Sequence, residues 1–529
     1  MLLKPEFVGR EEYGVVPKVM SVALIEPFDR WFLSLSKDSG TTRRNDCYTK
    51  SGGFDKLNHR NSNLLDSSIN LYYNIFFLND IFFCLMYFNF MQKNVGILKK
   101  FLNYVIPGLV GTILLSAYIF TDGFVVGQKL GSVALGALGI ATPIINLAYA
   151  FGFLFGMGGG SLFSISLGEG KENLAKKVFS TAIFFAIIFS VSIGILANVF
   201  IYPFSRFLGA DATNINYVVP YSRCLFIFLP FYFLNGLYQS FMRNEGHPNI
   251  SVACGIISNL LNVFLDFLFV FGFEWGMAGA AIASCMSVTL SVIANFIISY
   301  ALKTRIRFDI KNVEISIIKK ILKIGFSSFI GELSNGIVTF IYIYNAIKLY
   351  GSDGSAIFCV VLNWSLVFVC ITTGISQSAQ PLISHGYGAK EFSTVALVRR
   401  YMLITSLITG VIFLLFCNLI TNYLVDIFGT DNENVRIKSV YALKMYSPTF
   451  FINGISLAII GYFQAIGKAS NAASLSICRG VFLPVVLSLS GTILFGQNGL
   501  WLSMPAAELV TAVASGIMLH RNNKITMLG

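Results

Sequence analysis

Long apolar stretches limit the fold of this chain more than any other feature. From Met91 onward, windows of about 20 residues or more with very little charge recur twelve times. Because about 20 apolar residues make a helix long enough to cross the hydrocarbon core of a bilayer, the pattern predicts an all-α polytopic membrane protein with twelve transmembrane helices. The expected spans are 101–127, 134–162, 177–203, 217–242, 248–272, 276–302, 320–348, 354–383, 397–424, 440–466, 470–495 and 498–519.

Motifs of the first six spans recur in the last six. A shift of 218 positions matches Gly156, Gly168 and Gly170 with Gly374, Gly386 and Gly388, and Phe233-x-Asn235-Gly236 with Phe451-x-Asn453-Gly454. Each half holds six spans, an even number, so both halves enter the bilayer from the same side. We expect two six-helix lobes, 91–308 and 309–529, related by a pseudo-twofold axis along the membrane normal, with the substrate path between them.

The first 90 residues differ from the rest. They are polar up to about Asp66, whereas Leu71–Phe90 is apolar but interrupted by polar residues. We interpret residues 1–90 as an N-terminal extension that is disordered, or as a mis-assigned start upstream of Met91. A thirteenth membrane helix at Leu71–Phe90 is the alternative.

The distribution of charge predicts the orientation. Residues 1–90 hold ten Lys or Arg and ten Asp or Glu. The net charge of +12 therefore comes from the remainder, which holds 28 Lys or Arg and 16 Asp or Glu. If Met91 is cytoplasmic, 21 of those 28 basic residues gather on the cytoplasmic side and seven on the other. This positive-inside bias predicts a multi-pass cell-membrane protein with both ends of the 91–529 core in the cytoplasm, and it argues against nucleic acid as a partner.

The sequence offers little for enzymatic chemistry. Its nine cysteines are scattered without a Cys-x-x-Cys pair, and its four histidines are dispersed, so we expect no resident metal site, no disulfide framework and no catalytic centre. A phosphate-binding G-x-x-x-x-G-K-[ST] loop is also missing from the sequence, which excludes ATP-driven export by this chain alone. We expect a protein that is not an enzyme and has no cofactor.

Polar residues interrupt the aromatic stretch Asn259–Ser284. Asn262 and Asp266 are four residues apart and therefore share one helical face. A carboxylate in a transmembrane helix costs roughly 2.5 kcal/mol or more to insert, so it normally faces a protein interior or a water-filled cavity. We interpret Asp266 as a cation or proton site, with a structural hydrogen bond to a neighbouring helix as the alternative.

Six segments together resemble the multidrug and toxic compound extrusion (MATE) family, and its MepA-like bacterial branch in particular. They are IPGLVGTILLSAYIFTDGFVVGQKLG (Ile106–Gly131), SLGEGKENLA, NLLNVFLDFLFVFGFEWGMAGAAIAS, GISQSAQPLISHGYGAKE (Gly374–Glu391), FQAIGKASNAASLSICRGVFLP (Phe463–Pro484) and GLWLSMPAAE (Gly499–Glu508). The resemblance covers residues 91–529. It implies an antiporter that admits Na+ or H+ and exports small-molecule drugs, often lipophilic cations, by alternating access.

The resemblance also implies a cation-coupling site in the N-terminal lobe. The family's ligand positions correspond here to Asp122, Asn262, Asp266 and Ser284, where Ser stands in place of a frequent Thr. These residues would hold Na+ or H+, the coupling ion. A turn-like Thr121-Asp122-Gly123 leaves helix capping as the alternative role for Asp122.

Two further acids lie in expected spans of the C-terminal lobe. Glu332 is a possible substrate or coupling residue, about one turn from a functional glutamate of some family members, whereas we expect Glu508 to be structural. Shifting Asp122 and Asp266 by the repeat distance reaches Phe340 and an apolar segment. The C-terminal lobe therefore lacks the N-terminal constellation, as expected of a coupling site rather than of a structural requirement.

A lipid-linked saccharide flippase of the same superfamily is the alternative function. It would favour about fourteen helices and basic residues along the central cavity, whereas this sequence shows no intramembrane cluster of arginines. We expect the exporter to work as a monomer in the lipid bilayer.

Overall fold

The computed structural model describes residues 95–528, apart from 209, 211, 213, 352 and 428–432, and apart from some side chains within the first helix and those of residues 523–528. These residues belong to one unit of the chain, Asn89–Gly529. The expected extension 1–90 and its possible helix Leu71–Phe90 lie outside the described residues.

All regular structure in the described part is helical. The first half holds α3 (Val95–Gly168), α4 (Glu172–Val199), α5 (Ile201–Phe207), α6 (Ile215–Ile227), α7 (Leu229–Asn244), α8 (Pro248–Asp266), the π-helix η1 (Phe267–Gly272) and α9 (Gly276–Ala301). A linker with the short 3-10 helix η2 (Ile310–Asn312) follows. The second half holds α10 (Ile315–Tyr350), α11 (Asp353–Gly388), α12 (Phe392–Leu419), α13 (Thr421–Asp426), α14 (Glu433–Tyr446), α15 (Pro448–Ala465), α16 (Ala469–Ile477), the π-helix η3 (Cys478–Phe482) and α17 (Leu483–Leu528).

The prediction of an all-helical polytopic membrane protein is confirmed. Ten helical segments of the described residues are long and apolar enough to cross a membrane, and the bent pair α6 and α7 provides an eleventh. One of the ten, Ala469–Asn522, contains Gly496 with non-helical backbone angles. The chain folds back there, because Gly491 and Gly499 come into backbone contact on either side of it. Counting this segment as two spans makes twelve, as expected.

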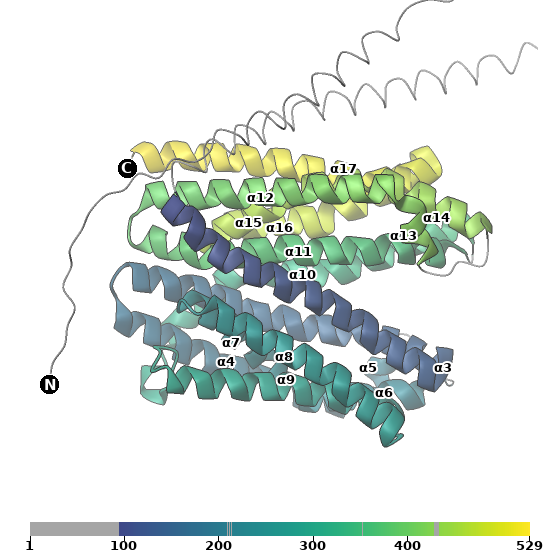
Figure 1. Ribbon diagram of the computed structural model, residues 1–529, viewed down its shortest axis with the longest axis horizontal. Coiled ribbons are helices and arrows are strands. Elements are labelled where there is room, and N and C mark those ends of the chain that lie inside the picture. The colour runs from purple at the N-terminus through teal and green to yellow at the C-terminus, as the bar shows by residue number, and fades with distance from the viewer. Residues whose placement is uncertain are drawn as a thin grey trace, which may run out of the picture. The chain divides into compact units, whose positions relative to one another are not determined.

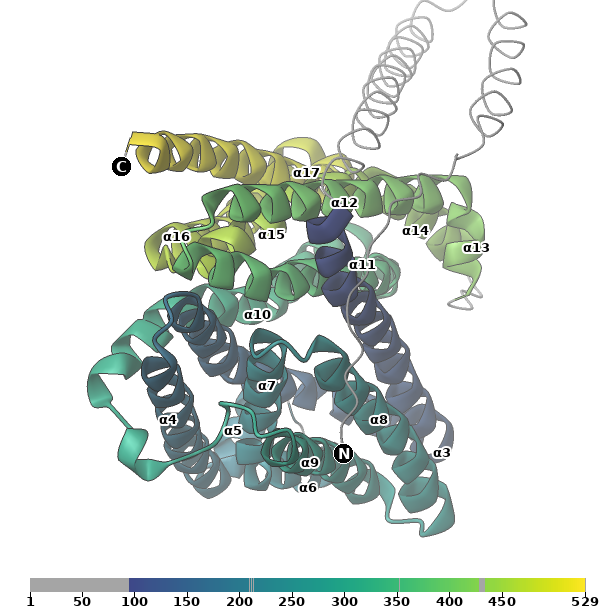
Figure 2. The ribbon, with the colours of Figure 1, turned by 60° about the vertical axis from the view of Figure 1, so that its left-hand side comes forward.

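The first helix differs in detail from the expectation. We expected a loop between spans 101–127 and 134–162, whereas α3 is assigned as one helical run of 74 residues. A straight helix of that length would measure about 110 Å, nearly four times the hydrocarbon core. Figures 1 and 2 show that α3 reverses direction, so it supplies two spans, Val95–Leu114 and Pro143–Gly168.

Buried apolar side chains form two main clusters among the described residues. One large cluster of buried side chains extends from Val125 to Ile321, and a second, from Tyr342 to Met504, draws only on the second half. In Figure 2 the helices α10–α17 gather in one group and α4–α9 in another. This grouping agrees with two lobes built from the two halves of the sequence.

Repeated glycines bring the two halves into backbone contact. A methyl group added to Gly168 would lie 2.1 Å from the carbonyl oxygen of His385, and one added to Gly388 would lie 2.1 Å from that of Ile165. Only Gly170 of the first glycine motif has a positive φ, +73°, and therefore serves the turn. Gly168 and Gly388 instead allow α3 and α11 to cross closely.

The linker between the halves is held by ion pairs. Arg305 contacts Glu172 at 2.8 Å and Glu245 at 3.2 Å, and Lys177 contacts Glu314 at 3.0 Å. The hydrogen bond to Glu172 raises the pKa of Arg305. These contacts tie the linker to the ends of α4 and α7.

Filling the glycine crossing should destabilise the protein. We expect Gly388→Ala to lower the free energy of unfolding by about 1–3 kcal/mol, because the methyl group meets backbone that cannot rotate away. Gly516→Ala on α17 is the matched control, since a methyl group there has no atom within 4 Å. Thermal unfolding in detergent measures both variants, and equal melting temperatures would contradict a close crossing at Gly388.

Candidate functional sites

Three of the four predicted cation-site residues meet between α8 and α9. With its amide nitrogen turned toward Asp266, Asn262 donates to Asp266 Oδ2 at 3.0 Å. Its amide oxygen then accepts from the hydroxyl of Ser284 at 3.1 Å and from the backbone N–H of Ser284 at 3.2 Å. The sequence placed Asn262 and Asp266 on one face of a helix; the structure adds that α9 presents Ser284 to the same point.

This site is buried. Asp266 is 0% exposed, Asn262 1% and Ser284 4%. Beside it, Ser258 of α8 donates to the backbone oxygen of Ser287 on α9 at 2.9 Å and so joins the two helices. Ser287 donates in turn to the backbone oxygen of Ser284, one turn earlier on α9, at 2.9 Å. The polar groups of α8 and α9 therefore face one another rather than lipid.

Asp266 stands where the helix geometry changes. It ends α8, and the π-helix η1 begins at the next residue, Phe267. Single π-helical turns inside α-helices are often found at functional sites. Here the change of winding occurs directly at the carboxylate.

The fourth predicted residue, Asp122, belongs to α3, which packs against α8 and η1. The backbone at Thr121–Gly123 is helical rather than a turn. The side chain of Asp122 lies outside the described residues, so its part in the site remains a prediction. Farther along α3, Lys129 forms an ion pair of 2.8 Å with Glu274, which follows η1.

Glu332 belongs to a different part of the molecule. It lies partly buried on α10, a helix that packs against α3. Phe329, three residues before Glu332 on α10, packs against Phe151 of α3 with ring centres 4.9 Å apart. The acid is thus placed beside aromatic rings where the two halves of the chain meet.

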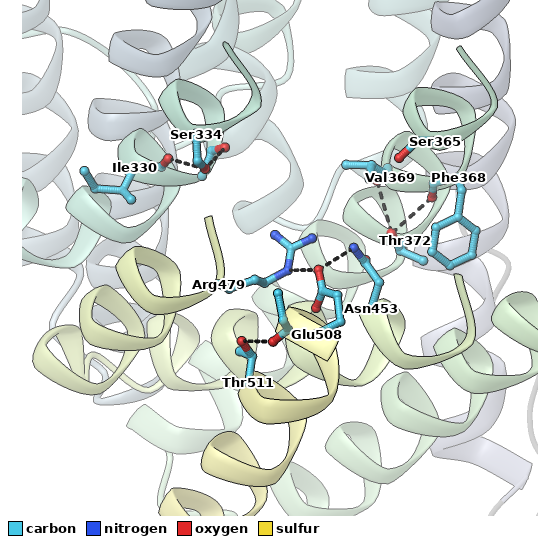
Figure 3. Close-up of polar contacts among 12 residues, drawn as sticks. Ile330, Ser334, Ser365, Phe368, Val369, Thr372, Asn453, Arg479, Glu508 and Thr511 are labelled. Carbon is cyan, nitrogen blue, oxygen red and sulfur yellow. Dashed lines mark hydrogen bonds and ion pairs between the residues drawn. The ribbon is translucent and has the colours of Figure 1, made fainter. Parts of the chain in front are cut away.

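Sequence reasoning missed a charged cluster in the second half. Arg479 on η3 contacts Glu508 on α17 at 2.9 Å, and the amide of Asn453 on α15 donates to the same carboxylate oxygen at 2.9 Å (Figure 3). Glu508 is 0% exposed and the side chain of Arg479 is 12% exposed. Arg479 lies within the expected apolar span 470–495, and this position was the sequence signal of its burial.

A second buried arginine lies where the halves touch. Arg243 on α7 donates to the side-chain oxygen of Gln377 on α11 at 3.3 Å. Gln380, one turn further, donates to the backbone oxygen of Met157 at 3.1 Å, and Ser164 donates to that of Pro381 at 3.1 Å. Hydrogen bonds therefore also join α3 and α11, the two helices that cross at Gly168 and Gly388.

These features define a two-lobed, all-helical membrane transporter with a buried acid in each lobe. The MatE family model matches residues 107–268 and again 328–489. The chain therefore belongs to the MatE family, whose members are transporters rather than enzymes. The duplicated match also agrees with the internal repeat.

Comparisons with individual proteins agree with this assignment. The chain is 25% identical over 434 residues to the multidrug export protein MepA of Staphylococcus saprophyticus, covering 80% of this chain and 94% of that protein. It is 26% identical over 445 residues to MepA of Staphylococcus haemolyticus, covering 83% and 97%. Two solved structures share the fold, each with a TM-score of 0.76 and 21% identity. The match to a MATE protein in complex with MaL6 covers 82% of this chain and 97% of that chain. The match to a multidrug resistance MATE family transporter in an outward-facing conformation covers 81% of this chain and 96% of that chain.

The buried ion pair makes a prediction about stability. Arg479→Gln should lower the free energy of unfolding by about 3–5 kcal/mol, because it leaves the carboxylate of Glu508 without its counter-charge. Adding Glu508→Gln should restore most of the loss, since the second change removes the unpaired charge. Thermal unfolding in detergent tests this, and a double variant as unstable as the single one would show that the pair is not the cause.

Proposed function

We propose that this chain is a cation-coupled multidrug exporter, which exchanges inward-moving Na+ or H+ for outward-moving lipophilic, often cationic, compounds by alternating access. The observation that carries the proposal is the buried Asp266, held by Asn262 and Ser284, in a chain of the MatE family. The names of its relatives support the export of drugs.

Burial of the acid supports coupling to a cation. A carboxylate removed from water is unfavourable unless it binds a proton, a metal ion or a charged side chain. Asn262 and Ser284 offer an amide and a hydroxyl, whose oxygen atoms can also serve as ligands of a cation. The site is therefore suited to an exchangeable cation, with Asp122 as the proposed additional carboxylate.

The surroundings of Glu332 support a cationic substrate. Tyr149 packs edge to face against Tyr232 with ring centres 5.9 Å apart, and Phe151 packs against Phe329. Aromatic faces attract organic cations, and a nearby carboxylate adds charge complementarity. We therefore assign Glu332 to substrate recognition rather than to the cation site of α8 and α9.

The glycine crossings support alternating access. The close contacts of Gly168 and Gly388 lie beside the loops at residues 169–171 and 389–391, which the charge distribution places in the cytoplasm. With these contacts closed, the proposed transporter is sealed toward the cytoplasm. Transport then requires these contacts to separate as the opposite ends of the lobes approach, within a monomer.

Efflux under defined gradients tests the function. We expect cells or proteoliposomes with this protein to export ethidium when an inward Na+ or H+ gradient is imposed. Asp266→Asn should reduce gradient-driven efflux by at least about fivefold, since it removes the coupled charge. Glu433→Gln, an exposed acid outside the site, is the matched control. Efflux that persists without any gradient, or in Asp266→Asn, would contradict cation coupling.

Thermal stability identifies the coupling ion independently. A cation that binds only the folded protein raises the melting temperature with its concentration. We expect either added Na+ or added protons to stabilise the purified protein, and we expect Asp266→Asn to lose that response while Glu332→Gln keeps it. A response that survives in Asp266→Asn would place the ion elsewhere.

A lipid-linked saccharide flippase remains the alternative, and the buried Arg243 between α7 and α11 is the observation that favours it. A guanidinium at that position suits a phosphate group. Ethidium efflux that depends on neither gradient, together with translocation of a fluorescent lipid-linked saccharide in proteoliposomes, would establish it.

A further inference from the structure

Two cysteines from distant parts of the sequence meet within the first half of the chain. The sulfur atoms of Cys224 on α6 and Cys285 on α9 lie 3.6 Å apart, although the residues are 61 positions apart in the sequence. The two helices pack against each other, as can be followed in Figures 1 and 2. No Cys-x-x-Cys spacing marks this pair in the sequence, so the thiols are brought together by the packing of α6 against α9.

The two cysteines lie at matching depths in their helices. Each follows the first residue of its helix, Ile215 or Gly276, by nine positions, which is roughly 14 Å along a helix. The charge distribution predicts that both helices begin on the outer side of the membrane. The pair is therefore placed toward the cell surface, where the environment is more oxidising than in the cytoplasm.

The two thiols differ in access. Cys285 is 0% exposed, whereas Cys224 is partly exposed. Redox-sensitive cysteines commonly combine a thiol that an oxidant can reach with a second, resolving thiol beside it. Cys224 is suited to react first, and Cys285 is close enough to resolve the product.

We propose that Cys224 and Cys285 are an oxidation site, at which a peroxide produces a disulfide that joins α6 to α9. The sulfur of Cys224 attacks hydrogen peroxide, so that an S–O bond forms, the O–O bond breaks and water leaves. The sulfur of Cys285 then displaces the hydroxyl group, which leaves as a second water with the proton of that thiol. The two thiols lose two electrons and the peroxide gains them. Because a disulfide has an S–S length of about 2.0 Å, the sulfur atoms approach by roughly 1.6 Å.

The disulfide would lie directly beside the proposed cation site. Cys285 follows Ser284, which donates to the amide oxygen of Asn262 on α8. Adjacent residues of α9 thus contact α8 and α6. In addition, α6 is the first part of a bent span, whose second part, α7, continues at an angle of 54°. A bond between α6 and α9 restrains this bend together with the helix that carries Ser284. Resting on the proposed export function, oxidation then slows transport by holding these helices in one arrangement.

Peptide mass mapping of the purified full-length protein tests the disulfide directly. We expect hydrogen peroxide to link the peptides that contain Cys224 and Cys285, and dithiothreitol to separate them. Oxidation should also raise the melting temperature, because the bond restricts the unfolded chain. Cys224→Ser should show neither effect, whereas Cys254→Ser, which removes a buried thiol of α8, should keep both. Oxidised wild-type protein without the linked peptide overturns the proposal.

Ethidium efflux from proteoliposomes tests the effect on transport. Oxidation should lower efflux by the wild type at least about fivefold, as a restraint coupled to the transport cycle would, and dithiothreitol should restore it. Cys224→Ser should be unaffected. A linked peptide with unchanged efflux, or an equal loss of efflux in Cys224→Ser, overturns the control of transport by this pair. Reduced wild-type protein that exports no ethidium contradicts the proposed function instead, and the linked peptide and the melting temperature then decide on the oxidation site alone.

Discussion

A charge within the hydrocarbon core must be neutralised by the protein itself, because lipid tails supply neither counter-ions nor hydrogen bonds. This requirement accounts for the polar interior of both lobes. Some polar side chains of the transmembrane helices bond across to a neighbouring helix, as Ser258 of α8 does to the backbone of Ser287 on α9. Such hydrogen bonds between helices help to hold neighbouring transmembrane helices together.

The two lobes meet the requirement differently. In the first lobe, Asn262 and Ser284 hold the buried Asp266, and the proposed mechanism adds a mobile cation at this carboxylate. In the second lobe, the charge of Glu508 is balanced by the permanent cation of Arg479. The repeat thus preserves the helices while the chemistry of the two lobes has diverged.

Glycine governs the boundary between the lobes. At Gly168 and Gly388 the backbones of α3 and α11 approach too closely for any side chain. Contacts of this kind rely on van der Waals packing and small residues, since membrane helices gain little from burying apolar surface against each other. A surface of this kind fits closely, but no side chains interlock across it. The two lobes can therefore make this contact and separate again, as the proposed alternating access requires.

The sequence by itself determined the class of fold, the number of spans, the repeat and the shared face of Asn262 and Asp266. Those properties depend on local hydropathy and helical periodicity, which need no knowledge of neighbouring helices. The sequence did not reveal that Gly168 and Gly388 serve a helix crossing, nor that Arg479 is buried against Glu508. Only the tertiary structure decided these points, as it decided that Ser284 meets Asn262, because the rotation and depth of each helix are set by packing between residues far apart in the chain.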